Sequence, residues 1–447
     1  MKIYSRLFII ILILSQSATL FAQSYWRVEN DRGDEILLSL ELNKSKNTFE
    51  VHTRKDALKD LAGTLMFSLA KAAGKLKYPE IVFIEGRTQQ KNDTLMLNGN
   101  FNYFDKQFVF NAAVSQNTFQ GRFLDARGNW QLLEGVRVAD AKPLRDYAAI
   151  ITSAFSLTEK SLVNAQWLKK DEWLDFKKKV NSLKSKISDD YELAATFFWL
   201  GKKLPFAPYE LSKVRPQNKG KKQRKQGGRK NIPSVRELKK NTAFFDANSF
   251  PSNKKEMDSI STAIRLKGYA NLVIDLRGNN KLKLNTAFLM LNYVAHQSFD
   301  AGVYLTRKWS DANKTIPTGS DYSKLLKSFA DPGYSAGKLK NEQGRYIKVV
   351  PTTNSFKGKV YLLVDGKTSH IAEMVASVMK NRKLATVVGQ KTAGITFLTE
   401  NIEINEEFDL VLADAEFYTF EGKNLEGIGV EPDVSKSNDD VMNYVLH

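Results

Sequence analysis

The feature that most constrains the fold is a set of apolar, strand-like runs in the second half of the chain. They are TAFFDANSF (242–250), NLVIDLRGN (271–279), KVYLLVDG (359–366) and ATVVGQKT (385–392). Stretches with the residue spacing of amphipathic helices separate these runs, and this alternation is typical of an α/β unit. The final stretch, FDLVLADAEFYTFEGKNLEGIGVEPDV, returns to strands and turns. We therefore predict an α/β core over residues 236–447.

A different pattern fills residues 23–138, where short segments alternate apolar and polar residues. The segments are EILLSLEL, TFEVHT, EIVFIEG, DTLMLNGNFNYF, QFVFNAAV and TFQGRFLD. This alternation predicts a mostly-β accessory domain, either a small antiparallel sandwich or an open barrel. A single helix is expected over about 56–76, with its apolar face formed by Leu58, Leu61, Leu65, Leu69 and Ala72. No catalytic constellation is visible there, so a docking or spacer role is the simplest interpretation.

Residues 139–211 are predicted to form a helical segment. Apolar residues recur at helical spacing over 160–183, and a second helix is expected over 187–204. Asp189 and Asp190 fall in the first turn of this second helix, where the helix dipole favours acidic residues.

Residues 212–235 are predicted to form a flexible basic linker. The run SKVRPQNKGKKQRKQGGRK (212–230) contains nine basic residues and no acid, which is half of the formal net charge of +18. Such a run cannot pack, so a solvated loop is the simplest interpretation. Adhesion to an anionic surface such as lipid, cell wall or an acidic partner is an alternative. Nucleic acid is not expected, because no aromatic residue is interleaved for base stacking.

The first 22 residues have the layout of a secretory signal peptide. Lys2 and Arg6 precede the apolar run LFIIILIL (7–14), and small residues lead to a cut after Ala22. The apolar run is far shorter than the roughly 20 residues that span a bilayer, so no transmembrane anchor is predicted. We expect an exported protein in the periplasm or at the cell exterior of a bacterium.

Residue usage excludes several kinds of chemistry. Cysteine is absent, which rules out disulfides, thiolate metal sites and a cysteine nucleophile. The four histidines, His52, His296, His370 and His447, are widely scattered, so neither a metal centre nor a cofactor is predicted.

Three blocks in the α/β core resemble the tail-specific, or C-terminal-processing, serine peptidase family. LVIDLRGNN (272–280) is similar to its strand and Gly-rich turn. VYLLVDGKTSHIAEMVASVMKNRKLATVVGQKTAG (360–394) is similar to its nucleophile turn, helix and Thr-x-Gly loop, and EGIGVEPDV (426–434) is close to its ending. The resemblance implies a ClpP/crotonase-like core that hydrolyses extended or unfolded peptides. A serine would attack, a lysine or histidine would take its proton, and backbone N–H groups at Gly278 and His370 would form the oxyanion hole.

The chain departs from this family at the positions that carry catalysis. His370 stands where the serine belongs, Ile395 where the lysine base belongs, and Pro208 near the histidine of the other branch. Isoleucine and proline side chains accept no proton, whereas a serine hydroxyl needs a base to attack. Ser369, beside His370, is the alternative nucleophile, although adjacent side chains usually point apart.

Two hypotheses follow from these departures. One is a serine peptidase with a site rearranged around Ser369 and His370. The other is a non-catalytic peptide-binding or scaffold protein on the same fold. In either case we expect Asp275 and Arg277 to brace their turn, Glu373 to support the start of a helix, and Lys391 to be solvated.

Overall fold

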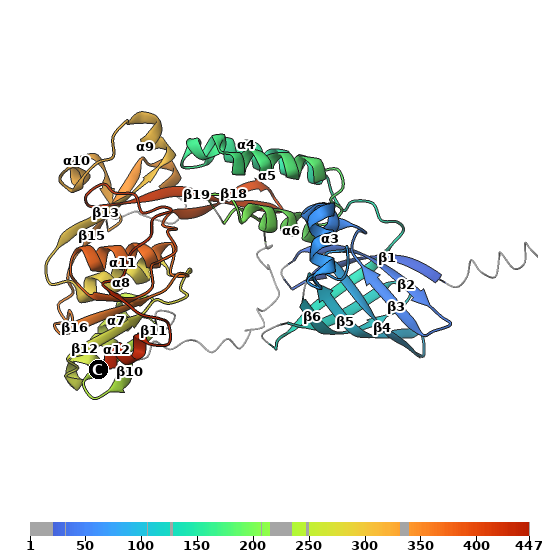
Figure 1. The fold of residues 1–447 in the computed structure, drawn as a ribbon, viewed down its shortest axis with the longest axis horizontal. Helices are drawn as coiled ribbons and strands as arrows, with labels where there is room; N and C mark the ends of the chain where they lie inside the picture. The colour runs from blue at the N-terminus through green and yellow to red at the C-terminus, as the bar shows by residue number, and fades with distance from the viewer. Residues whose placement is uncertain are drawn as a thin grey trace, which may run out of the picture. The chain divides into compact units, whose positions relative to one another are not determined.

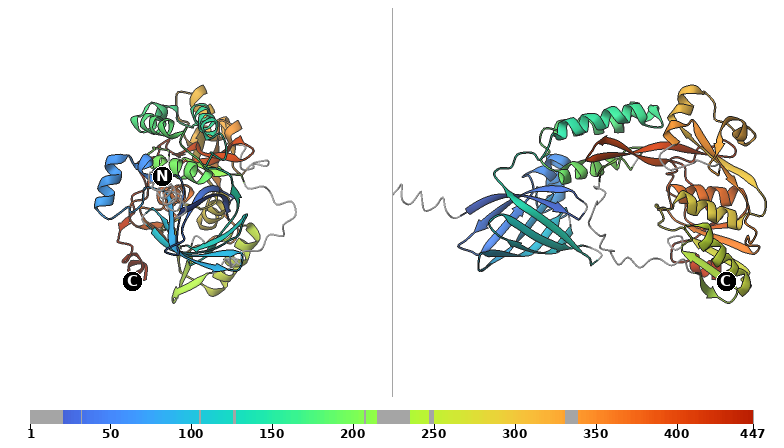
Figure 2. Two further views of the ribbon diagram at one scale, coloured as in Figure 1. Left: turned by 90° about the vertical axis from the view of Figure 1, so that its right-hand side faces the viewer. Right: turned by 180° about the vertical axis from the view of Figure 1, so that it is seen from behind.

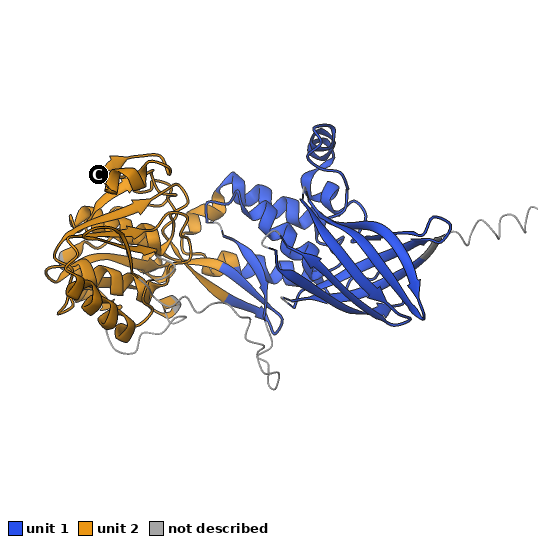
Figure 3. Ribbon diagram, turned by 90° about the horizontal axis from the view of Figure 1, so that it is seen from below, with its two compact units in different colours: residues 1–157, 170–216, 402–411 blue, residues 158–169, 217–401, 412–447 orange. Residues whose placement is uncertain are grey.

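The computed structural model describes residues 21–31, 33–104, 106–125, 128–206, 208–214, 235–246, 250–330 and 339–446. Residues 1–20 of the predicted signal peptide and residues 215–234 of the predicted basic linker lie outside the described residues. The chain divides into two compact units, which Figure 3 shows in different colours. Unit 1 comprises residues 1–157, 170–216 and 402–411, and unit 2 comprises residues 158–169, 217–401 and 412–447.

Unit 1 contains a closed antiparallel barrel in which each strand pairs with the next one along the chain (Figures 1 and 2). The strands are β1 (Phe21–Asn30), β2 (Glu35–Asn43), β3 (Thr48–His52), β4 (Val82–Lys91), β5 (Thr94–Tyr103), β6 (Lys106–Val114), β7 (Thr118–Leu124) and β8 (Trp130–Val138). The barrel closes because β1 also pairs with β8, with Tyr25 opposite Val138. Closure pairs the backbone groups that an edge strand would expose. The mostly-β prediction is confirmed, but the domain is a closed barrel and not a sandwich or an open barrel.

Large apolar side chains fill the inside of the barrel. Trp26 and Phe119 are buried with their ring centroids 5.9 Å apart. Gly86 on β4 lies directly opposite Gly99 on β5. A Cβ atom on Gly86 would lie 2.2 Å from the carbonyl oxygen of Asn98, so a larger residue would force the two strands apart.

The expected helix over 56–76 is two short helices, α2 (Ala57–Ala62) and α3 (Thr64–Ala72). The break lies at Gly63, whose φ of 84° ends the first helix. The second helix is therefore not in register with the first, and Phe67 is its buried residue. Leu65 and Leu69 are 72% and 57% exposed. The prediction of one continuous apolar face is wrong for this reason.

The helical segment contains α4 (Tyr147–Ser161), the 3-10 helix η1 (Ala165–Lys169), α5 (Asp171–Leu183) and α6 (Asp190–Gly201). The helix expected over 160–183 is thus interrupted before α5 begins. The side chain of Asp189 caps α6 by accepting a hydrogen bond from the N–H of Glu192 (2.7 Å), in agreement with its predicted place in the first turn.

Asp190 is the centre of a charged cluster in unit 1. Its carboxylate accepts hydrogen bonds from Arg145 Nε (2.8 Å), Tyr147 Oη (2.9 Å) and Lys213 Nζ (2.5 Å), and it is 1% exposed. Lys213 belongs to strand β9 (Glu210–Lys213), which pairs with residues 408–411 of β19 (Phe408–Thr419). The start of the predicted basic linker is therefore a strand, and its first lysine is bound in an ion-pair network.

Unit 2 contains most of two sheets, and its alternating strands and helices confirm the α/β prediction. The first has the order β10-β11-β12-β16-β17-β20 and is parallel from β11 onwards. Its strands are β10 (Arg236–Lys239), β11 (Thr242–Asp246), β12 (Asn271–Asp275), β16 (Lys359–Val364), β17 (Thr386–Gly389) and β20 (Val434–Ser435). The second sheet has the order β14-β15-β13-β19-β18. Its remaining strands are β13 (Phe299–Thr306), β14 (Lys327–Ser328), β15 (Gly344–Val349) and β18 (Leu398–Asn405).

Helices cover the first sheet, whose strands are apolar on both faces. The helices of unit 2 include α7 (Lys254–Lys267), α8 (Leu284–Val294), α9 (Arg307–Ala312), η3 (Gly319–Asp321), α10 (Tyr322–Leu325), η4 (Leu339–Asn341), α11 (Ile371–Asn381) and α12 (Val441–Leu446). Leu272, Ile274 and Leu362 point into the larger core, whereas Val273 and Leu363 pack with α12. This two-sided burial explains the continuous apolar runs in the sequence.

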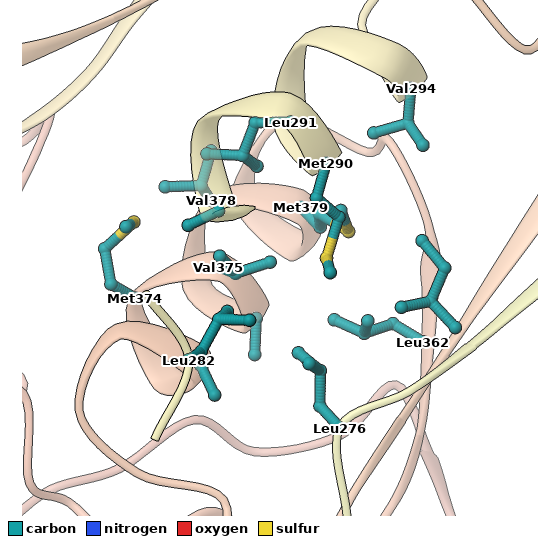
Figure 4. Packing of buried hydrophobic residues seen from close by; sticks show 14 of the residues in the cluster. Leu276, Leu282, Met290, Leu291, Val294, Leu362, Met374, Val375, Val378 and Met379 are labelled. Atoms are coloured by element: carbon teal, nitrogen blue, oxygen red, sulfur yellow. The ribbon is translucent and has the colours of Figure 1, made fainter. Parts of the chain in front are cut away.

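Helix α8 packs against α11, the helix that begins beside the strand ends. Figure 4 shows Met290 and Leu291 of α8 close to Val375, Val378 and Met379 of α11, with Leu276 and Leu362 nearby. Within the described ranges, no helix combines the length and the apolar character needed to cross a bilayer.

Candidate active site

Two loops meet where the neighbouring parallel strands β12 and β16 end. The N–H of Gly278, in the first loop, donates a hydrogen bond to Asp365 Oδ1 in the second (2.9 Å). The N–H of Ser369 donates to the carbonyl oxygen of Asn279 (3.1 Å). These bonds fix both loops at the carboxyl edge of the sheet, which is where ligands bind in open α/β folds.

Asp365 is held as a carboxylate inside its loop. Burial alone would raise the pKa of Asp365, but hydrogen bonds from the backbone of Gly278 and Lys367 and from Thr368 outweigh burial and lower this pKa. The Gly278 N–H, a predicted oxyanion donor, is therefore bound to a full negative charge. A substrate oxyanion would have to displace Asp365 to use this donor.

Asp275 and Arg277 form a two-pronged ion pair at the first loop. Arg277 Nε lies 2.9 Å from Asp275 Oδ1, and Arg277 Nη2 lies 2.7 Å from Asp275 Oδ2. Arg277 Nη1 also donates to the carbonyl oxygen of Asn438 (2.9 Å). Both side chains are thus occupied in bracing the turn.

His370 immediately precedes α11 and has a strained backbone. Its φ and ψ are 56° and −127°, a combination that glycine adopts readily and that costs other residues on the order of 1–3 kcal/mol. Its N–H donates to the carbonyl oxygen of Ile395, and its carbonyl accepts from the N–H of Glu373 (3.1 Å). The second predicted oxyanion donor is therefore also engaged within the protein.

The His370 ring is held against Phe397. Its Nδ1 lies 3.2 Å from the carbonyl oxygen of Phe397, and the two rings meet edge to face at 5.4 Å. Because a carbonyl oxygen only accepts, Nδ1 carries the hydrogen and Nε2 keeps its lone pair. Burial lowers the pKa of His370, although the hydrogen bond to Phe397 opposes this, so the ring is neutral at pH 7.

Ser369 lies next to His370 but is not coupled to its ring. Ser369 is 5% exposed, and within the described part of the chain no hydrogen bond joins its hydroxyl to the imidazole. The nearby amine, Lys391, forms an exposed ion pair with Glu431 (2.9 Å). In this arrangement neither the His370 ring nor Lys391 is hydrogen-bonded to the Ser369 hydroxyl.

Glu373, in the first turn of α11, joins three parts of the site. Its carboxylate accepts hydrogen bonds from the hydroxyl of Thr392, the N–H of Gly394 (2.7 Å) and the N–H of Ile395 (2.8 Å). Thr392 in turn accepts from the N–H of Val430 (2.7 Å). Glu373 therefore supports the Thr-x-Gly loop and the contact of this loop with the motif EGIGVEPDV (426–434). Burial raises the pKa of Glu373.

One further carboxyl group near this loop was not predicted as a site residue. Glu426 accepts hydrogen bonds from the N–H of Thr396 (2.9 Å) and its hydroxyl (3.4 Å). Burial, together with repulsion from Glu416 and Glu373, raises the pKa of Glu426 to about 7. Glu426 opens the motif EGIGVEPDV, but nothing in the motif signals that its carboxyl is buried.

The two other substituted positions differ in what surrounds them. Ile395 lies within this site, bonded to His370 and to Glu373 through its backbone. Pro208 belongs to unit 1, between α6 and β9, and its relation to the site in unit 2 is therefore not assigned.

Comparison with known proteins places this site in a family. The sequence profile of peptidase family S41 matches residues 241–436. A probable CtpA-like serine protease of Staphylococcus haemolyticus is 26% identical over 208 residues, which are 46% of this chain and 36% of that protein. A carboxy-terminal-processing protease of Bartonella bacilliformis is 29% identical over 75 residues, 17% of each chain. The chain thus spans only 36% and 17% of the length of these two relatives.

Solved structures of low sequence identity also align with the chain. A putative peptidase from Parabacteroides merdae aligns with a TM-score of 0.45 and 13% identity, over 67% of this chain and 93% of its own. The photosystem II D1 C-terminal processing protease aligns with a TM-score of 0.39 and 11% identity, over 66% and 94%.

The profile match and the strand-end site define a peptidase-type α/β domain over residues 241–436. This domain belongs to peptidase family S41, the tail-specific or C-terminal-processing peptidases. The resemblance carried by the three sequence blocks is thereby confirmed.

Proposed function

We propose that the mature protein holds extended or unfolded peptides on its S41 domain and that its own hydrolytic activity is impaired. The observation that carries this proposal is the bonding of His370, which stands at the serine position. Its N–H and its ring Nδ1 are bound to the carbonyl oxygens of Ile395 and Phe397. Ile395, at the lysine position, offers no side-chain base, so proton transfer from a nucleophile has no acceptor there.

Peptide binding does not need the missing groups. An extended peptide binds to a sheet edge through main-chain hydrogen bonds, and side-chain pockets add selectivity. Loss of a nucleophile therefore removes turnover and leaves this kind of recognition possible.

A second candidate function is a peptidase whose site is rebuilt around Ser369 and His370. The strained backbone of His370 favours it, because such strain persists where the surrounding structure enforces it and is common at active sites. The neutral ring, with a lone pair on Nε2, is also the form that a general base requires.

The remaining parts of the proposal concern location and organisation. We infer export to the bacterial periplasm or cell exterior from the signal-like residues 1–22. We further propose an accessory domain over 23–138, a helical segment over 139–211 and, after strand β9, a basic linker up to residue 235 that contacts anionic surfaces. Nucleic acid is not among the proposed partners.

The test is cleavage and binding of an unfolded protein such as reduced, alkylated casein. The wild type is compared with Ser369→Ala, His370→Ala and the double variant His370→Ser/Ile395→Lys. We expect binding without cleavage by the wild type and both alanine variants. The double variant restores a hydroxyl and an amine, and its cleavage requires the substrate oxyanion to displace Asp365 from the Gly278 N–H. Wild-type cleavage that Ser369→Ala or His370→Ala abolishes would establish the second candidate, and absence of binding by all four proteins would refute the first.

A further inference from the structure

A cavity of about 360 Å³ lies in unit 2 and shares no residue with the loops around His370. Its walls come from β13, α9 and the residues after it, β19, and the segment that contains Val163. Its lining includes Val163, Leu305, Trp309, Lys314, Glu416 and Tyr418. The volume is at the lower end of the range of about 300–1,000 Å³ that is usual for ligand pockets.

Glu416 is the acidic residue of this lining. It is 7% exposed, and it accepts hydrogen bonds from Asn164 Nδ2 (3.3 Å) and from Tyr418 Oη (2.7 Å). A carboxylate has about four acceptor positions, so two donors do not saturate it. Within the described part of unit 2, Glu416 forms no ion pair with a lysine, arginine or histidine.

The surroundings of Glu416 disfavour its negative charge unless a cation is present. Burial raises the pKa of Glu416, and Glu426 experiences repulsion from it. A buried carboxylate is stable when it is paired with a cation and hydrogen-bonded. Glu416 has the hydrogen bonds but lacks the cation.

The other walls suit a flexible cationic side chain. Trp309 lines the cavity and is held by a hydrogen bond from its Nε1 to the carbonyl oxygen of Thr315 (2.9 Å). Tryptophan attracts cations at its ring face, and Leu305 and Val163 supply apolar surface. Arginine and lysine bury an apolar stem and present a charged end, which matches this combination.

We propose that this cavity binds the charged end of an arginine or lysine side chain, with the cation at Glu416 and the methylene stem along Leu305 and Trp309. This inference rests on the proposed function in one respect, which is that a bound peptide carries the arginine or lysine. The cavity itself would recognise any guanidinium or ammonium group of suitable length.

Lys314 allows binding of a cation in this cavity to be distinguished from binding of an anion. It also lines the cavity, is exposed, and forms no ion pair with Glu416 in the described structure. If the cavity bound an anion, Lys314 would supply the attraction and Glu416 would oppose it. If it binds a cation, removing Lys314 leaves binding unchanged or strengthens it.

The experiment is isothermal titration calorimetry of the folded full-length mature protein with agmatine, a small guanidinium compound. Agmatine is expected to bind the wild type and Lys314→Ala, and to bind Glu416→Gln at least about tenfold more weakly, because a charge-assisted hydrogen bond is lost. Thermal unfolding of each variant verifies that it is folded. No binding to the wild type, equal binding to Glu416→Gln, or loss of binding in Lys314→Ala would overturn the proposal.

A second titration separates this proposal from peptide binding. Two otherwise identical unstructured peptides carry either arginine or its neutral isostere citrulline. Preference for the arginine peptide that disappears in Glu416→Gln supports the cavity as a specificity pocket. Equal binding of both peptides overturns the pocket and leaves peptide binding intact. Binding of agmatine without binding of either peptide retains the cation site and refutes the proposed function.

Discussion

His370 and Ile395 are joined directly through the backbone, because the N–H of His370 donates to the carbonyl oxygen of Ile395. These are the two residues that replace the serine and the lysine of the family pattern. Ile395 is fixed from its other side by Glu373, which accepts its N–H at 2.8 Å. Hydrogen bonds therefore hold the backbone at both substituted positions. A side chain introduced at either position would extend from this same backbone conformation.

The strain at His370 predicts an unusual order of stability between two variants. His370→Gly and His370→Ala both delete the ring and its contact with Phe397, but only glycine adopts φ 56°, ψ −127° without strain. We expect His370→Gly to be more stable than His370→Ala by about 1–2 kcal/mol in denaturant unfolding, although glycine is normally the less stable of the two. An alanine variant that is equal or more stable would show that this backbone conformation is not enforced.

The contacts of Glu373 predict that its carboxylate is structurally important. Glu373→Gln would place an amide NH₂ against one or more of the donors of Thr392, Gly394 and Ile395. We expect a loss of about 1–3 kcal/mol in the free energy of unfolding, since a buried donor is left unsatisfied. Glu431→Gln, at an exposed ion pair, is the matched control and should change little.

Glu426 predicts a specific dependence of stability on pH. Its pKa is raised from 4.5 to about 7, so the folded state binds more protons than the unfolded state between these values. This raised pKa makes the contribution of Glu426 to stability fall as the pH rises through that window. Glu426→Gln removes the contribution, so its melting temperature relative to the wild type should increase from pH 5 to pH 8. A difference that is constant with pH would contradict the assigned pKa.

The ion pairs around Asp190 predict that the stability of unit 1 depends on this buried carboxylate. Asp190→Asn leaves Arg145 and Lys213 with weaker partners, namely Glu35 and Glu407. Breaking a buried ion pair costs about 3–5 kcal/mol, and we expect the lower end of this range because those two acids remain. Asp140→Asn, at an exposed pair with Lys142, should leave the unfolding curve unchanged.

The α/β core could be predicted because its signals are local. Strands buried on both faces, such as β12 and β16, give uninterrupted apolar runs, and the glycine-containing turns after them lie close in sequence. The motifs that carry Gly278, His370 and Ile395 are local for the same reason, and their loops meet in the structure. The engagement of their N–H and carbonyl groups was not predictable, because it depends on contacts between loops far apart in the chain.

Other features were not predicted because they depend on which side chains the folded chain buries. Glu416 and Glu426 occur in ordinary-looking sequence, and only the folded chain brings Glu426 near both Glu416 and Glu373. The sequence predicts a sandwich or an open barrel instead of a closed one because the closing strand β8 carries Trp130 and Leu132 on its exposed side. Because β8 has apolar residues on its exposed face, its sequence lacks the alternation of apolar and polar residues that predicts a strand.

The pairing of β1 with β8 also has a consequence for how the barrel is made. Tyr25 and its partner Val138 lie at opposite ends of the barrel sequence, so the loop that their pairing closes is long and its entropy cost is large. Before β8 pairs with them, β1 and β7 present unpaired edges that can accept a strand from another molecule. A chain cut before residue 130 should therefore associate with other copies instead of remaining a stable shorter barrel.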